Sequence, residues 1–179
     1  MNYLIIGGSK SGKSEVGERI ALTLNRNEVT YIATMNPYDR EDEERIEKHK
    51  KSREGFNFKT LEVPRDLDSV INMINCKDTV LIDSITSLLT NEMFVENYLI
   101  KNPSHKILTD INHVMNSAKN VVIVSDYIFN DAIQYDEITE NFKKELAIIN
   151  RGLANYCENV IECSFGLIKY IKHKEKVTL

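Results

Sequence analysis

Residues 7–14, GGSKSGKS, have the composition and spacing of a phosphate-binding loop. Gly7 and Gly12 enclose four residues and are followed by Lys13 and Ser14, which matches the pattern G-x-x-x-x-G-K-[ST]. Glycines let backbone N–H groups turn toward an anion, and a helix that begins at the loop adds partial positive charge. In this pattern the lysine reaches the β- and γ-phosphates and the serine hydroxyl joins the Mg²⁺ shell. The residues predicted to bind a nucleoside triphosphate are Gly7, Gly8, Ser9, Lys10, Ser11, Gly12, Lys13 and Ser14.

An acidic residue on a neighbouring strand is expected to complete the magnesium site. Asp83 ends the apolar run TVLID, where a carboxylate can reach the ion or its waters. Asp126 ends the run VVIVSD in the same way and is the competing candidate. We predict Ser14 and Asp83 as the metal ligands. The alternative for either aspartate is a structural role, in which it caps the end of its strand and binds no metal.

Residues 40–54, REDEERIEKHKKSRE, form a highly charged helical segment without an apolar stripe. Arg45, His49 and Arg53 are four residues apart, so they project from one side of a helix. The surrounding cations disfavour protonation of the imidazole and attract a triphosphate. A neutral His49 could therefore attack an α-phosphorus and form a covalent intermediate. A charge run is more commonly a solvated helix face, and the spacing alone leaves both interpretations open.

Short apolar runs alternate with helical stretches along the chain. The strand before the glycine loop and the helix after it provide the context that a phosphate-binding loop requires. The alternation predicts an α/β fold, with a mostly parallel sheet covered by helices on both faces and one domain over residues 1–179. Strands are predicted at 2–6, 29–34, 57–63 (an edge strand), 78–84, 120–126, 159–164 and 166–172, the last two as a hairpin, and helices at 12–25, 37–55, 65–75, 86–101, 104–118 and 134–156.

The composition excludes several classes of protein. A formal net charge of −4 argues against a general nucleic-acid binder. No apolar run approaches the length of a membrane span, and the segment before the first glycine is too short for a signal peptide. The three cysteines, Cys76, Cys157 and Cys163, show no CxxC spacing and are expected to be reduced thiols of a cytoplasmic protein rather than metal ligands or disulfides.

Five segments occur in a characteristic order: GGSKSGKS (7–14), YIAT (31–34), DEERIEKHKKSR (42–53), TLEVP (60–64) and LIDSITSLLTNEMF (81–94). In this order they resemble the bifunctional adenosylcobinamide kinase / adenosylcobinamide-phosphate guanylyltransferase family. Residues 151–172 are similar to the carboxyl-terminal end of that family. Only the first segment is specific when taken alone, whereas the ordered set is much more so.

The resemblance implies two reactions on a P-loop fold of the RecA-like type, in a homotrimer. A nucleoside triphosphate, ATP or GTP, phosphorylates the aminopropanol hydroxyl of adenosylcobinamide, and GMP is then transferred from GTP to that phosphate. The family's GMP-carrying histidine corresponds to His49. The further nucleotide contacts that the resemblance implies are Ile32, Ala33, Thr34, Lys50, Lys51, Ser52, Arg53, Glu62 and Asp83.

One segment departs from the family pattern, and two other functions fit part of the sequence. The family has an Asn-Glu-Val-Gly-like segment after the fourth buried strand, whereas residues 125–137 read SDYIFNDAIQYDE, without glycine or proline. A small-molecule P-loop kinase would use Lys13, Ser14 and Asp83 but leave His49 idle. A non-catalytic nucleotide-binding regulator would instead use nucleotide occupancy to order a loop.

Overall fold

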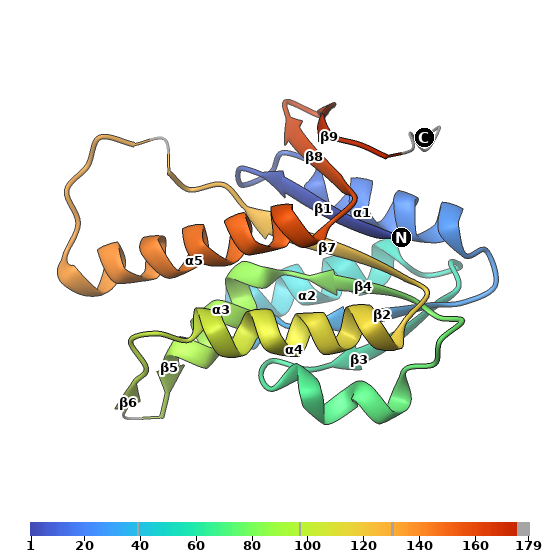
Figure 1. Cartoon of the computed structure of the whole chain (residues 1–179), viewed down its shortest axis with the longest axis horizontal. Helices are drawn as coiled ribbons and strands as arrows, with labels where there is room; N and C mark the ends of the chain where they lie inside the picture. The colour runs from blue at the N-terminus through green and yellow to red at the C-terminus, as the bar shows by residue number, and fades with distance from the viewer. Residues whose placement is uncertain (39, 97, 130, 175–179) are drawn as a thin grey trace.

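A computed structural model describes residues 1–38, 40–96, 98–129 and 131–174, and in helix α2 the side chains at 41, 42, 45, 48, 49 and 52 lie outside the description. A seven-stranded sheet in the order β3-β2-β4-β7-β1-β8-β9 forms its centre (Figure 1). Neighbouring strands are parallel except β8 and β9, which form an antiparallel hairpin. The strands are β1 Asn2–Gly7, β2 Val29–Ala33, β3 Phe58–Glu62, β4 Thr79–Asp83, β7 Asn120–Asp126, β8 Asn159–Ser164 and β9 Leu167–Lys172.

Helices cover both faces of the sheet, as the alternation of strands and helices predicts (Figure 1). Along β4, Val80 and Ile82 belong to the core beneath α3, α4 and α5, whereas Leu81 belongs to the core beneath α1. A central parallel strand must be apolar on both faces, which is why its sequence reads as a continuous apolar run. The helices are α1 Lys13–Leu24, α2 Arg40–Ser52, the 3₁₀ helix η1 Leu67–Met73, α3 Ile85–Met93, α4 Ser104–Ser117 and α5 Glu137–Tyr156.

The strand register brings the chemical motifs to one edge of the sheet. Gly7 at the end of β1 pairs with Asp126 at the end of β7. Ala33 at the end of β2 pairs with Asp83 on one side and with Glu62 on the other. Ligands of open α/β sheets bind at the carboxyl ends of the strands, so this edge is where a site is expected.

The predicted strands and most helices are confirmed, with differences after β4 and β3. The helix predicted over 86–101 is wrong beyond Met93, where α3 ends and a small antiparallel pair follows, β5 Phe94–Val95 with β6 Tyr98–Leu99. Aromatic and β-branched residues favour strands there, and Glu96 takes the positive φ of 51° that the turn requires. The helix predicted over 65–75 is a shorter 3₁₀ helix.

The cysteines lie in two kinds of environment and are all free thiols. Cys76 is exposed, whereas Cys157 and Cys163 are buried. Burial raises the pKa of Cys157 to about 12 and that of Cys163 to about 11. The two buried thiols are therefore protonated and unreactive near neutral pH.

Among the helices described, none has the length and apolar character that crossing a membrane demands.

Candidate nucleotide site

The glycine loop between β1 and α1 has the backbone geometry that its sequence predicts. Gly12 takes a φ of 87° at the N-cap of α1, where it has no side chain to occupy the first amide groups of the helix. Those amides remain available to an anion. Gly7 has no room for a side chain, because an added Cβ would lie 2.7 Å from the Cys163 carbonyl oxygen. A Cβ added to Gly12 would lie 4.0 Å from Gly166 Cα, so the β8–β9 turn borders this loop.

The two candidate aspartates have different partners. Asp126 Oδ1 lies 2.7 Å from Lys13 Nζ, which also donates to the Gly8 carbonyl at 3.3 Å. Asp83 Oδ2 instead accepts a hydrogen bond of 2.9 Å from the Tyr31 hydroxyl. The Lys13 side chain is only 9% exposed, and the Asp126 carboxylate neutralises its charge.

A cavity of about 410 Å³ opens beside the glycine loop, within the range of small-molecule sites. It lies between the carboxyl ends of β2, β3 and β4 and the helix α2. Ser14 and Asp83 both line it, as the predicted metal site requires. Its other lining residues are Tyr31, Ala33, Met35, Pro37, Glu43, Ile46, Glu47, Lys50, Arg53, Thr60, Glu62, Ser84 and Ser87. A second hollow of about 490 Å³ shares Lys50, Arg53, Thr60 and Glu62 and continues past Phe56 and Phe58.

Helix α2 is attached to the body of the protein through Arg53. The Arg53 guanidinium stacks on the Tyr31 ring, and its Nη1 lies 3.4 Å from Glu18 Oε1 on α1. Burial raises the pKa of Glu18, and the charge of Arg53 opposes that increase. Burial, together with the charge of Asp83, also raises the pKa of Tyr31. The phenol therefore stays protonated and serves as the hydrogen-bond donor to Asp83.

Among the side chains that the structure describes, six of the predicted site residues line the cavity. Ile32 is fully buried in the core, and Thr34 is buried with its hydroxyl donating to the Ser84 carbonyl at 2.6 Å. Lys51 is exposed. His49 and Ser52 belong to α2, but their side chains lie outside the described residues. The six that line the cavity are Ser14, Ala33, Lys50, Arg53, Glu62 and Asp83.

The sequence analysis predicted Lys50 but missed the other three residues of α2 that face the cavity, Glu43, Ile46 and Glu47. Glu43, Ile46, Glu47 and Lys50 line it and are spaced i, i+3, i+4 and i+7, which is one face of a helix. This spacing was present in the sequence and could have been found. Lys50 Nζ also lies 3.1 Å from Glu62 Oε1, so two predicted nucleotide contacts form an ion pair across the cavity.

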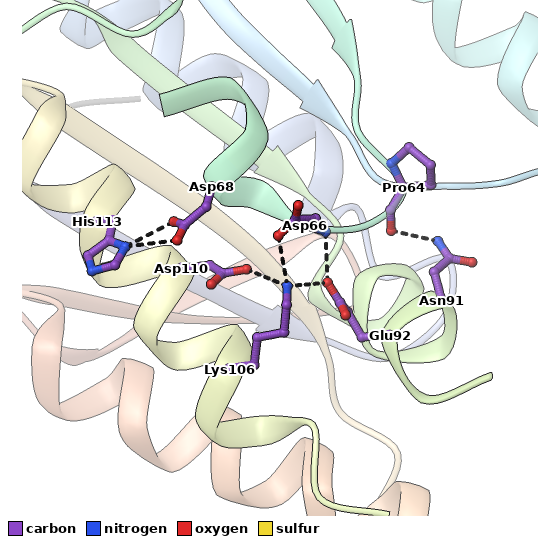
Figure 2. Close-up of polar contacts among 8 residues, drawn as sticks. All are labelled: Pro64, Asp66, Asp68, Asn91, Glu92, Lys106, Asp110 and His113. Atoms are coloured by element: carbon purple, nitrogen blue, oxygen red, sulfur yellow. Dashed lines mark hydrogen bonds and ion pairs between the residues drawn. The ribbon is translucent and has the colours of Figure 1, made fainter. Parts of the chain in front are cut away.

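Asn91 on α3 connects the two loops that border the cavity. Its Nδ2 donates to the Thr34 carbonyl at 2.8 Å and to the Pro64 carbonyl at 3.0 Å, the latter drawn in Figure 2. The Tyr38 hydroxyl donates to Asn91 Oδ1 at 2.8 Å. One buried amide therefore fixes the segment that leads from β2 into α2 and the segment that follows β3.

A cluster of charges continues from Asn91 onto α4 (Figure 2). Glu92 Oε1 accepts hydrogen bonds of 2.7 Å from the Asp66 amide and from Lys106 Nζ. Lys106 also contacts Asp66 at 3.2 Å and Asp110 at 2.8 Å. Burial raises the pKa of Asp110, and Lys106 opposes that shift. The cluster holds the start of η1 against α3 and α4.

One family model and several known proteins are similar to this chain. The family model described as "Cobinamide kinase / cobinamide phosphate guanyltransferase" matches residues 3–171. The "Bifunctional adenosylcobalamin biosynthesis protein CobP" of Pseudomonas aeruginosa is 27% identical over 168 residues, which cover 93% of this chain and 95% of that protein. The CobU protein of the same description from Escherichia coli is 38% identical over 95 residues, about half of each chain (52% and 51%).

A solved structure shares the fold at much lower identity. This structure, an ATPase domain, superposes with a TM-score of 0.54 at 10% identity, and the match covers 90% of this chain and 68% of that one. At this identity the likeness concerns the fold alone. It confirms the predicted RecA-like α/β architecture.

Proposed function

The chain belongs to the cobinamide kinase / cobinamide phosphate guanyltransferase family, and we propose how its residues perform both reactions. The protein is a bifunctional enzyme of adenosylcobalamin biosynthesis that acts on cobinamide and then on cobinamide phosphate. Its phosphate and guanylyl donors are nucleoside triphosphates. We propose GTP for the guanylyl transfer and ATP or GTP for the kinase reaction.

The triphosphate binds to the loop of residues 7–14. Lys13 leaves Asp126 and contacts the β- and γ-phosphates, while the open amides at the start of α1 bind the phosphate oxygens. Ser14 and Asp83 fit Mg²⁺ because a hydroxyl and a carboxylate are hard oxygen donors and line one cavity. Bound there, Mg²⁺ would neutralise charge on the phosphates. The described residues hold no group of three His, Cys, Asp or Glu side chains suited to a metal, which fits an ion coordinated mainly by phosphates and water.

His49 carries the guanylyl group in this proposal. It occupies the position on α2 directly before Lys50 and four residues before Arg53, both of which line the cavity. A neutral imidazole nitrogen attacks the α-phosphorus of GTP, and the bond to the departing pyrophosphate breaks. An oxygen of cobinamide phosphate then displaces the imidazole. The observation that supports this role best is that four α2 side chains, Glu43, Ile46, Glu47 and Lys50, face the cavity next to the glycine loop.

We also propose that residues 1–179 act as one cytoplasmic domain that assembles as a homotrimer on adenosylcobinamide. The free thiols support a reducing compartment. Exposed apolar side chains along β9 support assembly, since Leu167 is 74% and Ile171 is 56% exposed. The mass of the native protein in solution, measured by light scattering, tests the trimer.

Incubation with GTP labelled at the α-phosphate tests the guanylyl transfer. We expect a covalent label that is stable to alkali and labile to acid, that maps to His49 by peptide sequencing, and that is absent from His49→Ala. A simple kinase would transfer the γ-phosphate to adenosylcobinamide without labelling the protein. A non-catalytic regulator would show neither reaction.

A further inference from the structure

We propose that Asp126 accepts the proton of the substrate hydroxyl in the kinase reaction, an inference that rests on the proposed function. Asp126 is the last residue of β7 and lies beside Gly7 in the sheet register. Its Oδ1 is 2.7 Å from Lys13 Nζ. Because the lysine of this loop contacts the β- and γ-phosphates, the carboxylate lies next to the position of the transferred phosphoryl group.

The backbone of Asp126 is fixed from three sides. Its N–H donates to Thr86 Oγ1 on α3 at 3.3 Å, and its carbonyl accepts a hydrogen bond of 3.2 Å from Asn150 Nδ2 on α5. The next residue, Tyr127, donates its N–H to the Gly7 carbonyl at 3.0 Å. These contacts fix the backbone from which the carboxylate extends, and a proton acceptor in a reaction needs such a fixed position.

The Asn150 side chain is itself held in place. It is buried, and its Oδ1 accepts a hydrogen bond of 2.6 Å from the Ser125 hydroxyl. The Asp126 side chain is nevertheless 21% exposed, so a substrate can reach it. Asp83, and not Asp126, lines the cavity together with Ser14 and is the predicted metal ligand. The Asp126 carboxylate can therefore have a different role.

The reaction follows from the exchange of partners at Lys13. When the triphosphate takes Lys13, the Asp126 carboxylate loses its ion pair and is free to accept a hydrogen bond from the substrate hydroxyl. The substrate hydroxyl donates its proton to an Asp126 oxygen as the hydroxyl oxygen bonds to the γ-phosphorus. The bond from the γ-phosphorus to the bridging oxygen breaks, and its electron pair goes to the nucleoside diphosphate. Neither step of guanylyl transfer deprotonates a hydroxyl, so only the kinase reaction needs this base.

The test compares Asp126→Asn, Asp126→Glu and wild type in two assays on the same preparations. One assay is phosphorylation of adenosylcobinamide, and the other is labelling by GTP carrying the label at the α-phosphate. We expect Asp126→Asn to lower kinase turnover about 100-fold relative to the labelling rate. Asp126→Glu keeps a carboxylate, so its kinase turnover should be at least about tenfold higher than that of Asp126→Asn. Asp68→Asn is the matched control, because Asp68 lies on η1 and contacts His113 away from the cavity.

The outcomes separate this role from the proposed function. Provided that wild type is active in both assays, two results for Asp126→Asn would overturn the role of Asp126. One is an unchanged kinase rate, and the other is an equal loss of kinase and labelling activity. A folded Asp126→Glu with no more kinase activity than Asp126→Asn would also overturn it. Wild-type protein that neither phosphorylates adenosylcobinamide nor takes up label would overturn the proposed function and this inference together.

Discussion

The guanidinium of Arg53 lies over the ring of Tyr31, with Cζ 3.8 Å from the ring centroid. The hydroxyl of the same ring donates its hydrogen bond to Asp83. The Tyr31 side chain therefore links Arg53, which is predicted to bind nucleotide, to Asp83, which is predicted to bind metal. The position of α2, the helix that contains His49, depends on this link.

Replacement of Arg53 tests how firmly α2 is attached. Arg53→Ala removes the stacking contact and leaves Glu18 buried without its cation, so we expect the free energy of unfolding to fall by about 2 to 3 kcal/mol. Urea unfolding measures the change. Arg40→Ala is the matched control, because the ion pair of Arg40 with Glu44 is fully solvated and contributes little. Equal effects of the two variants would contradict the anchoring role.

The buried carboxyl of Glu18 should give stability a measurable pH dependence. Burial raises its pKa above the ordinary 4.5, so the folded state holds the proton more tightly than the unfolded state. This contribution is complete below pH 4.5 and is lost as the pH rises through the higher folded value. Glu18→Gln cannot titrate, so wild type should lose stability relative to this variant across that window. Urea unfolding at a series of pH values tests this, and a constant difference would contradict it.

Lys13 and His49 should separate the two reactions. Lys13→Ala is expected to lower both kinase turnover and guanylylation by about 100-fold or more, because both reactions need the triphosphate held at the loop. His49→Ala should abolish guanylylation and largely spare the kinase reaction. Both rates are measured on folded protein. Equal loss of both activities in His49→Ala would argue against a separate role for the histidine.

Asn91 should affect nucleotide binding without touching the nucleotide. Asn91→Ala leaves the Thr34 and Pro64 carbonyls without this donor, and we expect it to cost about 2 kcal/mol of stability. Because the loop into α2 loses its support, KM for the nucleotide should rise more than kcat falls. Asn141→Ala is the control, since Asn141 donates a solvent-exposed hydrogen bond to the Lys101 carbonyl. A stable variant with unchanged KM would contradict the prediction.

Local patterns in the sequence were sufficient for most of the fold and for the glycine loop. The apolar runs indicated the strands because buried parallel strands must be apolar on both faces, and Phe165-Gly166 indicated the last turn. The end of α3 at Met93 was missed, because helix and strand preferences compete over a short apolar run.

Contacts between distant segments could not be predicted in the same way. Asp83 and Asp126 both end apolar runs, and only the order of the strands places Asp126 beside Lys13 and Asp83 beside Tyr31. The links made by Asn91 join distant segments, since Thr34 is 57 residues and Pro64 is 27 residues away along the chain. No local pattern specifies such a partner.

The closeness of Gly166 to Gly12 has a practical use. Phe165, the neighbour of Gly166, is almost entirely open to solvent, so a small fluorophore attached there would stand beside the proposed phosphate site without filling it. Such a dye would turn the arrival and departure of a nucleotide into an optical trace, and each half of the catalytic cycle could be timed in a single stopped-flow experiment.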